Sequence, residues 1–381
     1  MPRKRINAFD LGFRQGRIAG FERGKQDGAQ QGYEQAKEQL YPFYRKILVV
    51  TPSYDLPSLE IIINQPLAHL QNQGICTFDV VTEGELSQTL IEGYEMIVFL
   101  RSIEPEVLEY MRLANQLGKK TVYAVDDNFL EIPKWAAVYP YYNTLERREA
   151  FKHFLSEAQV VKTGAPYFAD YIRQHYNAHV ADIPDSFNHE WVEQAAKPSR
   201  NDGKIVIGYG GTMKDGDFAP VTSALIEILK KYKDKVEIHF HGYAPAPLLQ
   251  FEQVKYVPQQ FNYRDYIRVL HQSGWDIGMA PLADTNFNAC KTNNKYREYS
   301  SCGIPGIYSR SPAYTPWIFH GENGYLTNHS HEGWLEGLTR LIEDAPLRNH
   351  IREKAALHVK EQFSVSLCSH RWKDLILKKG G

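Results

Sequence analysis

Short runs of aliphatic and β-branched residues alternate with amphipathic stretches along most of the chain. Helix-like stretches lie near residues 58–73, 104–118, 143–157 and 165–177, and the apolar runs between them predict six strands. This alternation is typical of a parallel sheet with crossover helices, so residues 46–192 are predicted to form one open α/β domain. The six strands are expected at Ile47–Thr51, Ile75–Val81, Met96–Leu100, Thr121–Val125, Val160–Thr163 and His179–Ile183.

A second series of the same kind follows a polar stretch at 193–203. This stretch lacks periodicity and contains Pro198, which indicates a linker. Helices near 218–232, 262–273, 293–302 and 331–343 then predict a second α/β domain at 204–362, with a ligand cleft between the two domains. The amphipathic end, 363–381, is expected to cover the last face and cross back to the first domain. The strands of this domain are expected at Ile205–Tyr209, Val236–His241, Lys255–Val257, Trp275–Ala280 and Gly306–Ser309.

Residues 1–45 have a different pattern, because glycine recurs there at every fourth position. If the segment is helical, the glycines form a strip along which a partner can approach closely. Each glycine also lowers helix propensity by roughly 1 kcal/mol relative to alanine, so a lone helix is not expected. Two interpretations stay open: a flexible charged tail, or a helix that orders by self-association or with a protein partner. The repeat consists of Gly12, Gly16, Gly20, Gly24, Gly28 and Gly32.

Composition narrows the class of protein. The chain has 44 Lys plus Arg and 45 Asp plus Glu, so it lacks the net charge that would favour nucleic acid or an anionic membrane. No apolar run is long enough for a membrane span. Its 4 cysteines show neither disulfide nor zinc spacing, and the histidines lack a metal-ligand pattern. A metal-independent cytoplasmic protein is therefore expected.

Two loops after strands of the second domain carry candidate chemistry. The segment Gly208–Thr212 joins an apolar strand to a helix, and its glycines would let a diphosphate approach the backbone; a plain tight turn is the alternative. The segment from Lys291 to Pro305 predicts a helix of about three turns, with Thr292 or Asn293 as N-cap. Its amino end would attract phosphate, and Glu298 could bind a vicinal diol. The alternative is a Lys295–Glu298 surface pair.

The string KTNNKYREYSSCGIPGIYS, which begins at Lys291, resembles the retaining GT-B glycosyltransferases. APL before it and Tyr314 and GENGYL at 321–326 after it extend the likeness to glycosyltransferase group 1 and glycogen-synthase-like C-terminal domains. The resemblance spans about 46–378 and is strongest over 205–330. It implies two Rossmann-like domains facing across a cleft, with the donor held mainly by the C-terminal one and no obligatory metal.

The resemblance also assigns roles to particular residues. Lys291 corresponds to the lysine that neutralises the donor diphosphate, and Glu298 to the glutamate that holds the ribose. The resemblance implies a nucleoside-diphosphate sugar, UDP- or GDP-linked, as the donor, and a glycan, a protein or another molecule as the acceptor. Many relatives carry a second glutamate where this chain has Cys290, and their arginine–lysine pair is reduced here to Lys214. The predicted donor-binding set is Gly210, Gly211, Thr212, His241, Tyr256, Val257, Pro258, Lys291, Thr292, Asn293, Asn294, Lys295 and Glu298.

First-domain loops are expected to serve the acceptor. Asp126 and Asp127 end a strand, and the resemblance favours a role in the cleft over a turn or cap; the loop Thr51–Asp55 is expected to line the acceptor side. Asp126, Asp127, Lys214 and Lys291 are therefore the candidate catalytic residues of a retaining glycosyltransferase. Two alternatives remain: a sugar-nucleotide epimerase or hydrolase of the same fold, and a catalytically reduced scaffold that binds nucleotide sugar.

Overall fold

The computed structural model describes residues 23–25, 27–28, 43–44, 46–193, 202–212, 214–258 and 262–379. Residues 45–377 form one compact unit, and residues 1–44 with 378–381 form another. In the smaller unit Gly24 and Gly28 lie in helical residues, and Phe43 pairs with Lys378. The other glycines of the repeat lie outside the described residues, as does most of the expected linker, 194–201.

The first lobe of the larger unit is a six-stranded parallel sheet. Its order is β2-β1-β3-β4-β5-β6, so the strand order reverses between β1 and β3. Both faces are covered, which explains why β1 and β3 are almost continuously apolar. The strands are β1 (Lys46–Thr51), β2 (Thr77–Thr82), β3 (Met96–Leu100), β4 (Lys120–Ala124), β5 (Val160–Thr163) and β6 (Val180–Asp182).

Helices cover this sheet, and two of them, α3 and α5, are not predicted from the sequence. A π-helical turn at Leu59–Asn64 runs into α2 (Gln65–Asn72), and such turns often occur at functional sites. The unpredicted helices α3 and α5 are short, which leaves them little periodic signal. The remaining helices are α3 (Gln88–Glu92), α4 (Pro105–Gln116), α5 (Tyr139–Tyr142), α6 (Leu145–Glu157) and α7 (Pro166–His175).

The second lobe is also a six-stranded parallel sheet, in the order β12-β11-β10-β7-β8-β9. This is the Rossmann order, with its reversal between β7 and β10. The expectation of two Rossmann-like α/β domains is confirmed; β12 was not predicted, because three residues give almost no pattern. The strands are β7 (Ile205–Gly210), β8 (Val236–His241), β9 (Val254–Val257), β10 (Ile277–Ala280), β11 (Gly306–Ser309) and β12 (Tyr325–Thr327).

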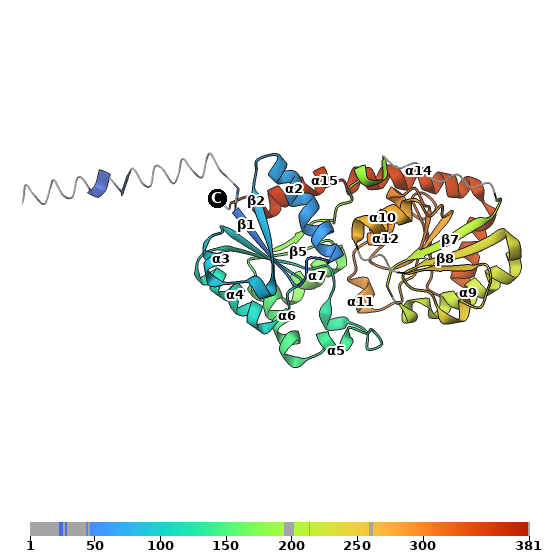
Figure 1. Cartoon of the computed structure of the whole chain (residues 1–381), viewed down its shortest axis with the longest axis horizontal. Helices are drawn as coiled ribbons and strands as arrows, with labels where there is room; N and C mark the ends of the chain where they lie inside the picture. Colours follow the sequence, from blue (N-terminus) through green and yellow to red (C-terminus); the bar gives the residue numbers. More distant parts are fainter. Residues whose placement is uncertain are drawn as a thin grey trace, which may run out of the picture. The chain divides into compact units, whose positions relative to one another are not determined.

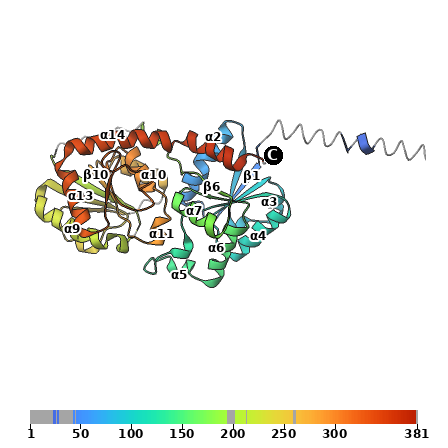
Figure 2. The same cartoon turned by 180° about the vertical axis from the view of Figure 1, so that it is seen from behind.

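The second lobe's helices include the final pair, which runs along both lobes. In Figures 1 and 2 these red helices continue from α14 beside the second sheet to α15 beside α2 of the first lobe, and α15 packs on α2. Where the chain crosses between lobes, the Phe187 amide donates to the Phe363 carbonyl at 2.8 Å. The helices are α8 (Glu190–Glu193), α9 (Asp215–Tyr232), α10 (Tyr263–His271), α11 (Asn286–Ala289), α12 (Asn294–Ser301), α13 (His331–Glu343), α14 (Ala345–Gln362) and α15 (Val365–Trp372).

In open parallel sheets, ligands bind beyond the carboxyl ends of the strands, at the point where the strand order reverses. The loops after β1, β3, β7 and β10 are therefore the places where the fold positions a site.

Among the described residues, no helix is both long and apolar enough to cross a membrane.

Candidate functional site

A cleft of about 1320 Å³ lies between the two lobes, and loops at the carboxyl ends of both sheets line it. Most of the residues singled out from the sequence are part of its wall. Gly210, Tyr256 and Asn293 are not. The residues that the cleft brings together are Asp126, Asp127, Gly211, Thr212, Lys214, His241, Val257, Pro258, Lys291, Thr292, Asn294, Lys295 and Glu298.

Helix α12 points its amino end at this cleft. Asn293 occupies the N-cap position, but its side chain accepts no hydrogen bond from the amides of the first helical turn. The first amides of a helix have no intrahelical partner, and they carry the positive end of the helix dipole. At the other end, Gly303 has a φ of 64°, and the Ile304 amide donates to the Tyr299 carbonyl at 2.8 Å. These contacts form a Schellman motif, so the helix ends where the sequence predicts.

Three lysines surround the same part of the cleft. Lys291 Nζ donates to Asp127 Oδ1 of the first lobe at 2.9 Å, and Lys214 Nζ lies 3.2 Å from Asp217 Oδ2. Lys295 Nζ lies 2.6 Å from Glu298 Oε2. Burial lowers the pKa of Lys214 to about 8, against the opposing effect of Asp217. The arrangement places three ammonium groups, each paired with a carboxylate, beside a helix amino end, where they can also bind a polyanion.

Glu298 lies on α12, and only 3% of its surface is exposed. Its Oε2 accepts hydrogen bonds from Lys295 and, at 3.2 Å, from the Tyr266 hydroxyl. The expected Lys295–Glu298 pair therefore exists, but it lies in the cleft wall. Tyr266 was not identified from the sequence, because its position next to Glu298 depends on how α10 packs on α12.

The carboxylates after β4 form a network with Arg101, which follows β3. Arg101 pairs with both Asp126 and Asp127, and the Ser58 hydroxyl donates to Asp126 Oδ2 at 2.6 Å. Burial opposes ionisation of Asp127, but Lys291 and Arg101 outweigh it and leave its pKa lowered. Both carboxylates face the cleft, although alternation along a strand suggested that only one would.

Arg101 also lines the cleft, and sequence reasoning missed it. Its φ of 57° is uncommon for a residue with a side chain. The sequence signal is its place directly after a buried strand, at the sheet edge where ligands bind. A lone arginine there gives no sign of the two carboxylates that it will meet.

Two amides of the glycine loop after β7 already have acceptors within the protein. The Gly211 amide donates to the His241 carbonyl at 2.9 Å, and the Gly210 amide donates to the Tyr299 hydroxyl at 3.3 Å. Neither amide is available to a diphosphate in this structure. A Cβ on Gly210 would lie 2.7 Å from the Tyr266 hydroxyl, so close packing explains this glycine better than ligand contact.

The end of the second sheet supplies further wall residues. Burial lowers the pKa of His241 to about 4, so its ring is neutral at neutral pH, and its Nδ1 has no partner among the described residues. Val257 and Pro258 line the cleft. Tyr256 is half-exposed instead, and its hydroxyl donates to the Gly242 carbonyl at 3.3 Å.

Cys290 is buried and does not line the cleft. Its Sγ accepts from Asn128 Nδ2 of the first lobe at 3.7 Å, and burial raises the pKa of the thiol to about 12. Within the described part of the chain, no group of three or more His, Cys, Asp or Glu residues could hold a metal ion.

No family model and no curated protein matches the sequence. Solved structures do match its fold. HepE from Anabaena, in complex with UDP and glucose, is 15% identical over 86% of this chain and 98% of HepE, with a TM-score of 0.63. The chain has the GT-B fold. Sucrose-phosphate synthase from Thermosynechococcus elongatus is 13% identical over 87% of this chain and 98% of its own, with a TM-score of 0.64. A putative UDP-N-acetylglucosamine 2-epimerase from Listeria monocytogenes is 9% identical over 86% of this chain and 94% of its own, with a TM-score of 0.52.

Proposed function

We propose that the protein is a glycosyltransferase that moves a sugar from a nucleoside-diphosphate donor to an acceptor, with retention. The observation that carries this proposal is the amino end of α12, which meets Lys291, Lys295 and Lys214 inside the interlobe cleft. Two phosphates need a dense, fixed set of positive groups, and helix amides with lysines provide one without a metal ion. The complexes of HepE with UDP and with UDP-glucose, on the same fold, support a UDP-linked donor.

Each wall of the cleft has its own part in this proposal. On the second lobe, the lysines and the α12 amides stabilise the departing diphosphate, and Glu298 binds the ribose hydroxyls. On the first lobe, Asp126 and Asp127 orient the acceptor hydroxyl. Holding donor and acceptor together is itself a large part of the rate enhancement in such a reaction. The glycine-loop amides have no part in it, because both already donate to protein atoms.

A donor-turnover assay tests the proposal. The full chain is incubated with UDP- and GDP-sugars, with and without glycan and protein acceptors, and the released nucleoside diphosphate and the glycosylated product are quantified. We expect acceptor-dependent release that continues in the presence of EDTA. Absence of both nucleotide binding and nucleotide release would contradict the proposal.

Cys290 supports a second candidate, a scaffold that binds nucleotide sugar without transferring it. A buried thiol with a raised pKa cannot supply the carboxylate that many relatives of this type carry at this position. An epimerase or hydrolase would give a third pattern, because it converts the donor without any acceptor. The same assay separates the three: acceptor-dependent product, binding without turnover, or turnover without acceptor.

A further inference from the structure

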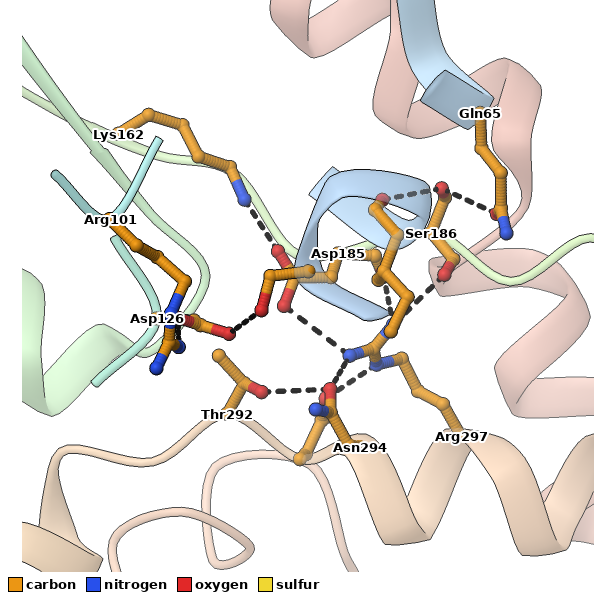
Figure 3. Close-up of polar contacts among 12 residues, drawn as sticks. Gln65, Arg101, Asp126, Lys162, Asp185, Ser186, Thr292, Asn294 and Arg297 are labelled. Atoms are coloured by element: carbon orange, nitrogen blue, oxygen red, sulfur yellow. Dashed lines mark hydrogen bonds and ion pairs between the residues drawn. The ribbon is translucent and has the colours of Figure 1, made fainter. Parts of the chain in front are cut away.

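Arg297 lies one residue before Glu298 on α12, and only 1% of its surface is exposed. Its Nη1 donates to the carbonyl oxygens of Asp185 and Ser186 at 2.8 and 2.9 Å. These two residues belong to the segment by which the chain leaves the first lobe. Figure 3 shows the guanidinium between that segment and the start of α12. Arg297 therefore connects the cleft helix to the first lobe.

The rest of the guanidinium binds side chains at the amino end of α12. Arg297 Nε donates to Asn293 Oδ1 at 3.0 Å, and Nη2 donates to Asn294 Oδ1. The side-chain oxygen of an N-cap asparagine normally accepts from amides of the first helical turn. In α10 the N-cap Asn262 does so, at 2.9 and 3.3 Å. In α12 the equivalent oxygen is bound by Arg297, and the helix has no side-chain cap. The backbone differs as well, because Asn293 has a ψ of 34° where the capping Asn262 is extended, with a ψ of 129°.

The acceptors on the first-lobe side are themselves fixed. Lys162 and Arg297 both pair with the Asp185 carboxylate, and all three side chains are buried. The Ser186 hydroxyl donates to Gln65 Oε1 of α2 at 2.9 Å. Breaking one member out of a buried ionic group is costly, so the arginine has no low-energy alternative position. The Asn293 oxygen is held by a rigid partner.

We propose that Arg297 is a positioning residue of the donor site, which holds the Asn293 side-chain oxygen off the α12 amides and thereby keeps them free for the donor diphosphate. The inference rests on the proposed function, because that function supplies the diphosphate that the free amides would bind. Loss of Arg297 would let Asn293 take the extended conformation that Asn262 has, and its side chain would then cap the helix and compete with the diphosphate. Arg297 itself need not touch the ligand.

Calorimetry with UDP and with GDP on the full chain tests this inference as a double-mutant cycle. The proteins are wild type, R297M, N293A and the double variant R297M/N293A. We expect R297M to weaken binding about five-fold, the factor given by about 1 kcal/mol, which is typical of an N-cap. We expect the double variant to bind more tightly than R297M, because the competing cap has been removed. A merely structural role of Arg297 would not give this recovery.

The matched control is R348M, which removes another buried arginine. Arg348 donates to the Leu341 and Ile342 carbonyls and does not line the cleft, so its loss should leave nucleotide affinity unchanged. If R297M does not fold, as judged by circular dichroism, the nucleotide affinities of R297K and of R297K/N293A are compared instead. Equal affinities of R297M and the double variant, with wild-type binding intact, would overturn the inference. Failure of the wild type to bind either nucleotide would instead overturn the proposed function.

Discussion

The ion pair between Lys291 and Asp127 predicts that one first-lobe carboxylate competes with the donor. The two side chains join the lobes at 2.9 Å, and each is about one-fifth exposed (21% and 22%). The lowered pKa of Asp127 means that it is ionised at neutral pH. A donor diphosphate must therefore share Lys291 with this carboxylate or displace it. Asp127→Asn removes the competing charge and keeps the shape of the side chain.

The size of the effect follows from the exposure of the pair. Two unit charges about 4 Å apart attract by about 4 kcal/mol at an effective dielectric constant of about 20. Water reaches both groups, and forming the pair costs desolvation, so its net worth should fall towards the value of exposed pairs, about 1 kcal/mol. We therefore expect Asp127→Asn to tighten UDP binding about five-fold. Transfer should slow at the same time, since Asp127 is proposed to orient the acceptor.

Asp126→Asn is the matched control, because Asp126 pairs with Arg101 and Ser58 and no ion pair joins it to Lys291 among the described residues. Isothermal calorimetry with UDP measures the affinity of both variants, and the donor-turnover assay measures transfer. The expected pattern is tighter binding for Asp127→Asn only. Weaker binding by Asp127→Asn, or an equal gain in both variants, would refute the competition between Asp127 and the diphosphate.

Two further predictions concern the donor side of the cleft. In the wild type we expect UDP to bind at least about ten-fold more tightly than 2′,3′-dideoxy-UDP, because hydrogen bonds to a charged group contribute about 1.5–3 kcal/mol. Glu298→Gln should reduce this preference. An unchanged preference by calorimetry would show that Glu298 does not bind the ribose. UDP affinity should fall as pH rises through about 8, because Lys214 carries its charge below its pKa of about 8 and loses it above. Titrations from pH 7 to pH 9 measure this fall, and Lys214→Met should flatten it; an equally steep fall in that variant would assign the dependence to another group.

Much of the fold could be predicted because parallel strands buried on both faces leave a strong sequence signal. Met96–Leu100, Val160–Thr163 and Val236–His241 have the bounds expected from their apolar runs. β12 and the helices α3 and α5 have too few residues to show a period, so tertiary packing decides them. The helix expected near 293–302 ends as predicted, because Gly303, with a φ of 64°, takes the left-handed position that favours glycine.

The site was only partly predictable, for a different physical reason. Lys291 and Glu298 share one short segment, so α12 and the residues just before it bring both into the cleft wall. Arg101 and Arg297 depend on partners far along the chain, Asp126 and Asp185, and no local pattern reports such pairs. The acceptor of the Gly211 amide could not be predicted for the same reason, because the His241 carbonyl belongs to another strand.

A crystal structure of the protein with UDP tests the central claim most directly. The account predicts that the diphosphate lies at the amino end of α12, with phosphate oxygens within hydrogen-bond distance of Lys291 Nζ and of the first helix amides, and with the ribose against Glu298. A diphosphate bound elsewhere, with these amides and Lys291 left to water or protein, would contradict it.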